Sequence, residues 1–143
     1  MPAVAMCRGT HYARTYPAAP DQVGAVRRDF REFHRRVLDD ETLDTAVLLV
    51  SELTANAVLH SGSERVTVHA DLRQHYLVVE VLDEGGRPWC PAPADSDHPH
   101  GLEIVETLAL EWGMEEISGA GADVVGGGAS PGRMVWASLN VAA

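Results

Sequence analysis

The stretch that decides the fold reads VLLVSELTANAVLH and spans residues 47–60. An α-helix turns about 100° per residue, so Glu52, Asn56 and His60, each four apart, stack along one face. The opposite arc is apolar, and its members are Leu43, Ala46, Val47, Val50, Leu53 and Ala57. The sequence therefore predicts a helix whose apolar arc packs against a core while a carboxylate, an amide and an imidazole point together.

This polar face admits two interpretations. Mg²⁺ prefers oxygen ligands and keeps several waters, so the amide of Asn56 could hold a hydrated cation while Glu52 acts as a general base beside it. A polar helix face is also commonly just solvated. The helix alone leaves both interpretations open.

Composition narrows the class of protein. At 143 residues with 45% hydrophobic content and three Trp, the chain is expected to be one globular domain. Its net charge of -10 excludes nucleic acid as an expected partner, because phosphate binding requires a basic patch. Cys7 and Cys90 show no metal spacing and are read as unpaired thiols in a reducing cytosol.

No membrane or export signal is expected either. We expect no stretch of the sequence to be apolar over the length that a membrane-spanning helix needs. The first eight residues lack both a basic start and an apolar stretch typical of a signal peptide. The sequence predicts a cytoplasmic protein without a membrane partner.

Periodicity and breakers place the secondary structure. The sequence predicts helices over residues 20–37, 41–60 and 101–112. It predicts strands over residues 11–16, 65–72, 76–82, 114–117 and 134–141, the second and third forming a hairpin. Residues 85–99 and 118–132 are expected to be loops, and Trp136 is expected in the core.

Three further segments carry chemistry: VEVLDEGGRP at 79–88, HGLEIV at 100–105 and GRMVWA at 132–137. Asp83 ends an apolar strand and precedes two glycines that would let the backbone approach a ligand. Gly101 opens a helix, and unpaired N–H groups at a helix start favour phosphate. Together with the 47–60 stretch, these segments place candidate ligand-binding residues at four points of the sequence.

In order and spacing the four segments resemble the nucleotide-binding boxes of the GHKL ATPase superfamily. Within it they look most like the anti-sigma-factor serine kinase branch (the RsbW type), in its single-domain actinobacterial form, over residues 12–139. The resemblance implies an α+β fold, the two-layer α/β sandwich of the Bergerat or histidine-kinase-like ATPases. Its sheet is mixed and mostly antiparallel, with helices on one face. The implied ATP-binding domain spans residues 10–142, after a short tail at 1–9.

The resemblance also assigns roles to residues. It makes Glu52 the catalytic base, Asn56 the Mg²⁺ ligand, and Asp83 the residue that reads adenine, while His60 either contacts the nucleotide or only closes its helix. The ATP-binding residues that it implies are Asn56, His60, Asp83, Gly85, Arg87, His100, Gly101 and Leu102. The cationic candidates near the phosphates are Arg87, His98 and His100.

The chain departs from the family pattern at three boxes. Arg87 stands where Asp-x-Gly-x-Gly has its last glycine, and Pro99 replaces the first glycine of Gly-x-Gly-Leu. Met134 stands where many members have threonine. Proline removes one N–H donor and stiffens the loop in which it lies.

Two functional hypotheses follow. The first is an ATP- and Mg²⁺-dependent serine/threonine protein kinase that phosphorylates a small anti-sigma-factor antagonist. A sigma factor would be a further partner. The resemblance also implies a homodimer, which is common in the family. The second is a non-catalytic module that regulates a partner by docking. Glu52 and Asn56 favour the kinase, whereas Arg87, Pro99 and Met134 favour the module.

Overall fold

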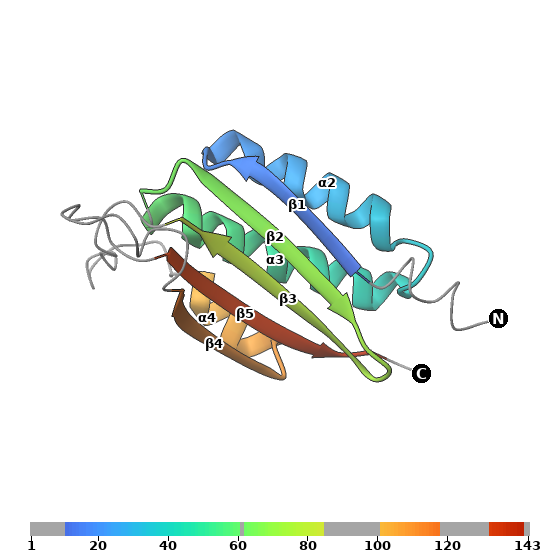
Figure 1. The fold of residues 1–143 in the computed structure, drawn as a ribbon. Helices are drawn as coiled ribbons and strands as arrows, with labels where there is room; N and C mark the ends of the chain where they lie inside the picture. Colours follow the sequence, from blue (N-terminus) through green and yellow to red (C-terminus); the bar gives the residue numbers. More distant parts are fainter. Residues whose placement is uncertain (1–10, 61, 85–100, 118–131, 142–143) are drawn as a thin grey trace.

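The computed structural model describes residues 11–60, 62–84, 101–117 and 132–141. They form a five-stranded sheet with three α-helices on one of its faces (Figure 1). The predicted tail, both cysteines, the 85–99 loop and nearly all of the 118–132 loop lie outside these residues. The predicted domain limits of 10 and 142 stay a prediction.

The strands follow the order β1-β2-β3-β5-β4 across the sheet. Every neighbouring pair of described strands is antiparallel, so this part of the predicted mixed sheet is purely antiparallel. The predicted α+β sandwich is confirmed. The strands are β1 (His11–Pro17), β2 (Arg65–Leu72), β3 (Tyr76–Asp83), β4 (Glu111–Ile117) and β5 (Gly132–Asn140).

Helix α3 is the central helix and lies between the other two (Figure 1). Its N-terminus is capped by Asp39, whose carboxylate accepts a hydrogen bond of 2.7 Å from the N–H of Thr42. Beyond its C-terminus Gly62 takes a φ of 67°, a conformation that glycine adopts without steric cost. The helical elements are η1 (Pro20–Gln22), α2 (Val23–His34), α3 (Asp40–His60) and α4 (Gly101–Leu108).

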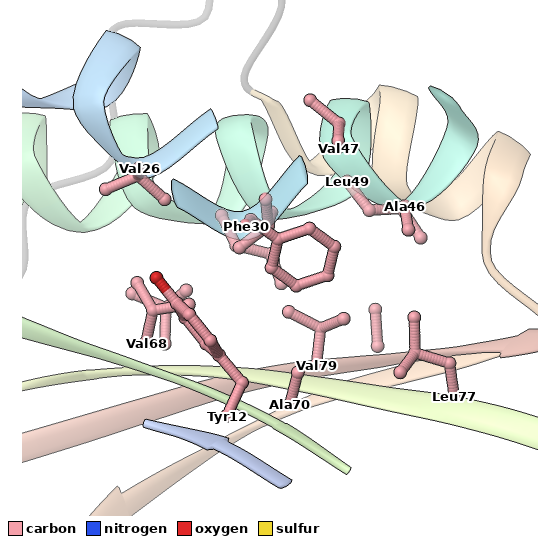
Figure 2. Packing of buried hydrophobic residues seen from close by; sticks show 14 of the residues in the cluster. Tyr12, Val26, Phe30, Ala46, Val47, Leu49, Val68, Ala70, Leu77 and Val79 are labelled. Carbon is pink, nitrogen blue, oxygen red and sulfur yellow. The ribbon is translucent and has the colours of Figure 1, made fainter. Parts of the chain in front are cut away.

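The core lies between the helices and the sheet. In Figure 2 side chains of the helices point down toward side chains that rise from the strands, and Phe30 of α2 reaches toward Tyr12 of β1 with ring centroids 5.8 Å apart. The predicted apolar arc of α3 is buried throughout. Its members are Leu43, Ala46, Val47, Val50, Leu53 and Ala57.

Two predicted helices are too long. The first ends at His34 rather than residue 37, and the last predicted apolar position, Val37, is 39% exposed. The second ends at Leu108 rather than residue 112, because residues 111 and 112 pair with β5 and extend β4. At residues 111 and 112 sheet pairing outweighs the helical periodicity.

The prediction for Trp136 is wrong. Strand alternation buries Val135 and Ala137 beneath the helices and turns Trp136 to the opposite face of the sheet. There it covers Gly113, where an added Cβ would lie only 2.8 Å from the indole nitrogen.

The expectation that no apolar stretch is long enough for a membrane span is also wrong. The stretch Asp40–Leu59 has the length and composition for one, with a mean hydropathy of 1.3. More than half of this stretch is buried inside the protein, as expected for a core helix covered by a sheet and two neighbouring helices.

One ionisable side chain is enclosed in this core. His34 is fully buried among the rings of Tyr12, Phe30 and Phe33. Its Nδ1–H donates to the carbonyl oxygen of Phe30 at 2.8 Å, and its Nε2 has no hydrogen-bond partner within the described part of the chain. Burial lowers the pKa of His34, and the hydrogen bond to Phe30 opposes this shift only in part.

Replacing His34 with phenylalanine should flatten the dependence of folding stability on pH. An unfolded histidine titrates near pH 6.5, so the unfolded state takes up the proton first as the pH falls. The native protein therefore keeps its stability above about pH 6.5 and loses it progressively below that value. Urea unfolding at about pH 7.5 and about pH 5 measures the difference. His75→Gln, in the exposed β2–β3 turn, is the control and should retain the native slope; a native slope in His34→Phe would contradict the prediction.

Candidate nucleotide-binding site

The candidate site lies at one end of the sheet. Helix α3 and strand β3 both end there, and helix α4 and strand β5 both begin there (Figure 1). Segments that are far apart in the sequence thus bring the predicted boxes to the same end of the molecule.

Helix α3 positions Glu52 and Asn56. Its flank toward α2 is marked by Ser51, whose hydroxyl accepts a hydrogen bond of 2.8 Å from Arg27. At 100° per residue Asn56 lies about 140° round the helix from Ser51, on the flank toward α4. Glu52, one turn before Asn56, is partly exposed, whereas Asn56 is only 4% exposed.

The amide of Asn56 carries an unusual feature. Its Oδ1 atom is buried and has no hydrogen-bond partner within the described residues. A buried acceptor without a partner costs free energy, so such an atom is often completed by a ligand or an ion. An amide oxygen is also an oxygen ligand of the kind that Mg²⁺ prefers, so Asn56 fits the metal that the resemblance implied.

Asn56 suits a cation whose other ligands are mainly phosphate oxygens of a bound nucleotide and water. The described part of the chain contains no group of three or more His, Cys, Asp or Glu side chains that could hold a metal ion. Mg²⁺ sites in nucleotide-binding proteins typically combine one or two protein oxygens with phosphate oxygens and water. A single amide ligand is consistent with that type of site.

The end of β3 is fixed to the chain that leaves α3. The hydroxyl of Ser63 accepts a hydrogen bond of 3.0 Å from the N–H of Glu84, and the carboxylate of Glu84 pairs with Arg65 at 2.8 Å. Asp83, the preceding residue, is 9% exposed. These contacts hold Asp83 at the same end of the molecule as the last turns of α3.

Strand β5 approaches Asp83 closely. A Cβ added at Gly132 would lie 2.7 Å from the backbone oxygen of Asp83, so only glycine fits there without displacement. Arg133 is the register partner of Asp83, so a cationic residue lies near the site. The sequence analysis did not include Arg133 among the site residues. Only the strand register, and no local motif, could have revealed it.

Met134 does not line this site. It is the register partner of Leu82 and shares with it the sheet face turned away from the helices. A threonine hydroxyl at this position, whose absence sequence reasoning counted against nucleotide binding, would therefore lie on the face of the sheet opposite to the helices.

The other predicted residues are placed only in part. Leu102 packs against the core from the first turn of α4. Gly101 is the first residue of α4 and His60 the last residue of α3. Gly85, Arg87, His98 and His100 lie outside the described residues, so the roles assigned to them stay predictions.

Comparison with known proteins identifies the class. The sequence model of the family described as "Histidine kinase-like ATPase domain" matches residues 16–125. The matched range contains α3, Asp83 and α4 and ends before β5. The chain belongs to this family, and it is an ATP-binding domain of the GHKL superfamily. No curated protein matches it.

Gly132→Ala should weaken ATP binding and lower stability. The new methyl group would meet the Asp83 carbonyl, a backbone atom that cannot rotate away, and overpacking of this kind costs about 1–3 kcal/mol. Calorimetric titration of ATP and urea unfolding measure the two effects. Gly24→Ala is the control, because an added Cβ there meets nothing within 4 Å; native behaviour of both variants would contradict the close approach.

Proposed function

We propose that this protein is a cytoplasmic, ATP- and Mg²⁺-dependent serine/threonine protein kinase of the anti-sigma-factor type. Its substrate is a serine of a small antagonist protein, and a sigma factor is its second partner. The serine oxygen forms a bond to the γ-phosphorus of ATP, and the bond from that phosphorus to the bridging oxygen breaks. ADP leaves, and the serine proton passes to Glu52.

One observation carries the proposal. Glu52 and Asn56 lie one turn apart on α3, and the buried Oδ1 of Asn56 lacks a partner within the described residues. A solvated helix face would leave its amide in contact with water, whereas Asn56 is 4% exposed. The pair therefore supports a ligand site with a carboxylate at its rim better than it supports a solvated face.

Glu52 is suited to the role of base. Its carboxylate is partly exposed, so a hydroxyl presented by another protein can reach it. A general base must lie within hydrogen-bond reach of the proton that it removes, and phosphoryl transfer otherwise needs mainly positioning and charge stabilisation. We assign to Glu52 the orientation of the serine hydroxyl and the acceptance of its proton.

Asn56 and Asp83 would hold the two ends of the nucleotide. We assign Asn56 Oδ1 to the cation, and Asp83 to the adenine amino group, for which a carboxylate is a strong acceptor. Mg²⁺, when bound, supplies positive charge that stabilises the charge developing on the phosphoryl oxygens. The N-terminus of α4 at Gly101 faces the same end of the sheet and favours anionic phosphates.

The docking module remains the second candidate, and the two altered glycine boxes favour it. Arg87 and Pro99 replace glycines that the family uses near the phosphates. A proline withdraws one N–H donor from that loop, which lowers the stabilisation available to the triphosphate. A module of this kind would bind its partner without transferring phosphate.

Asn56→Ala should abolish the part of ATP binding that depends on Mg²⁺ and leave the fold intact. The native amide oxygen has no protein partner within the described residues, so its removal breaks no internal hydrogen bond at that atom. Calorimetric titration of ATP with and without Mg²⁺ measures the effect. Thr54→Val, a buried polar change on the opposite flank of α3, should bind like the native protein. An unchanged effect of Mg²⁺ in Asn56→Ala would remove the metal role.

Glu52→Gln should slow phosphotransfer by about 10²–10⁴-fold while ATP and the antagonist still bind, because a general base typically contributes that much to the rate. The assay follows radiolabelled phosphate from ATP to purified antagonist proteins encoded by the same genome. Glu41→Gln, exposed in the first turn of the same helix, is the matched control and should transfer at the native rate.

The results separate the two candidates. Native transfer by Glu52→Gln would overturn the role of this residue as base. Binding of an antagonist without any transfer by the native protein would favour the docking module over the kinase.

A further inference from the structure

Positive charge is concentrated in one short segment of an acidic protein. The chain has a net charge of -10 and 11 basic residues, every one of them arginine. Five of the 11 fall within residues 27–36, in α2 and the turn that follows it. They are Arg27, Arg28, Arg31, Arg35 and Arg36.

The arginines of α2 lie together on one side of the helix. Arg27, Arg28 and Arg31 fall within an arc of about 100° that runs from the flank facing α3, at Arg27, to the outer side, at Arg28. Asp29 is turned the other way, toward β1, where its carboxylate pairs with Arg14 at 3.1 Å and accepts a hydrogen bond from Tyr16 at 2.9 Å. Glu32, one turn after Arg28, is the carboxylate on the exposed side of α2 and pairs with Arg35 at 3.4 Å. Arginines therefore outnumber carboxylates on this side, which is a local cationic surface.

Two of these arginines are held in place by α3. Arg27 donates to the hydroxyl of Ser51 at 2.8 Å, and Arg31 pairs with Asp44 at 2.9 Å. Leu48 lies between Ser51 and Asp44 on the same side of α3 and is 42% exposed. An exposed leucine is thus bracketed by two anchored guanidinium groups.

Arg28 adds a positive charge that is available to a partner. It is exposed and makes no ion pair or hydrogen bond with another side chain in the described residues. Arginine beside a solvent-exposed apolar residue is typical of protein-binding hot spots, because its planar group pairs with carboxylates and packs on apolar surface.

We propose that Arg27, Arg28, Arg31 and Leu48 form a docking surface for an acidic face of the acceptor protein. Partner carboxylates pair with the guanidinium groups, and an apolar partner side chain covers Leu48. Glu52 lies one turn beyond Leu48, so a protein seated here is next to the base assigned above. The inference rests on the proposed function in taking the acceptor as the partner.

Other occupants fit this surface less well. A second copy related by a two-fold axis would place arginine against arginine, because such an interface is self-complementary. Nucleic acid and anionic membranes are repelled over a longer range by the net charge of -10. An acidic protein needs only the local patch to match.

Arg28→Glu and Leu48→Ser test the surface in the phosphotransfer assay. Each should raise the KM for the antagonist roughly tenfold or more, as for a hot-spot residue, and leave kcat and the affinity for ATP unchanged. Arg73→Glu in the β2–β3 turn and Leu110→Ser, which is 58% exposed, are the matched controls and should behave like the native protein. Arg28→Ala supplies a second variant for the charge.

The outcomes distinguish this surface from the proposed kinase activity. An unchanged KM in Arg28→Glu and Leu48→Ser, with normal transfer, overturns the docking surface and leaves the kinase. If the native protein binds the antagonist without transferring phosphate, and binding is weaker in both variants but not in the controls, the kinase is overturned and the docking surface is supported. Tighter native binding to a DNA duplex or to phosphatidylserine vesicles than to the antagonist, lost in Arg28→Glu, overturns the assignment to a protein partner.

Discussion

The burial of the apolar arc of α3 on the sheet is the constraint on which the rest of the structure depends. Ala46, Val50 and Leu53 are inaccessible to solvent, and truncation of a buried leucine such as Leu53 to alanine costs about 2–5 kcal/mol. That packing fixes the rotation of the helix about its own axis. Once the rotation is fixed, Asn56 is turned toward α4 and Ser51 toward α2, so one hydrophobic interaction sets both the candidate site and the arginine surface.

Most of the architecture could be predicted because it depends on local periodicity. Strands β2 and β3 have strongly alternating sequences, and α3 has a continuous apolar arc. Asp39 and Gly62 mark the ends of α3. The errors fall where local and long-range preferences compete. Residues 111 and 112 can continue a helix on pattern alone, but pairing with β5 satisfies their backbone in the sheet. Alternation does not by itself say which face of a strand is the inner one, and here Val135 and Ala137 take the inner positions and leave Trp136 on the outer face.

The candidate site could be predicted only in part, for a related reason. Glu52 and Asn56 are one helical turn apart, so the sequence fixes their relation directly. Arg133 is the register partner of Asp83 in a strand pair whose members lie 50 residues apart in the sequence, and no local pattern encodes that register. The same holds for Ser63 and Glu84, whose hydrogen bond depends on where two separate elements end. Relations that arise from strand register require the structure.

The charge distribution follows from the same packing. Phe30 and Val26 hold one side of α2 against the core, so its charged residues can occupy only the remaining arc. Asp29 is drawn into the contact with β1 and faces away from Arg27 and Arg28, whereas Arg31 and Arg35 pair with Asp44 and Glu32. An acidic protein thereby displays a cationic face next to its candidate catalytic residue, and both lie on α3 or against it. Recognition of a protein partner by α2 and chemistry on that partner by α3 would then both depend on the packing of α3, whose orientation the core holds.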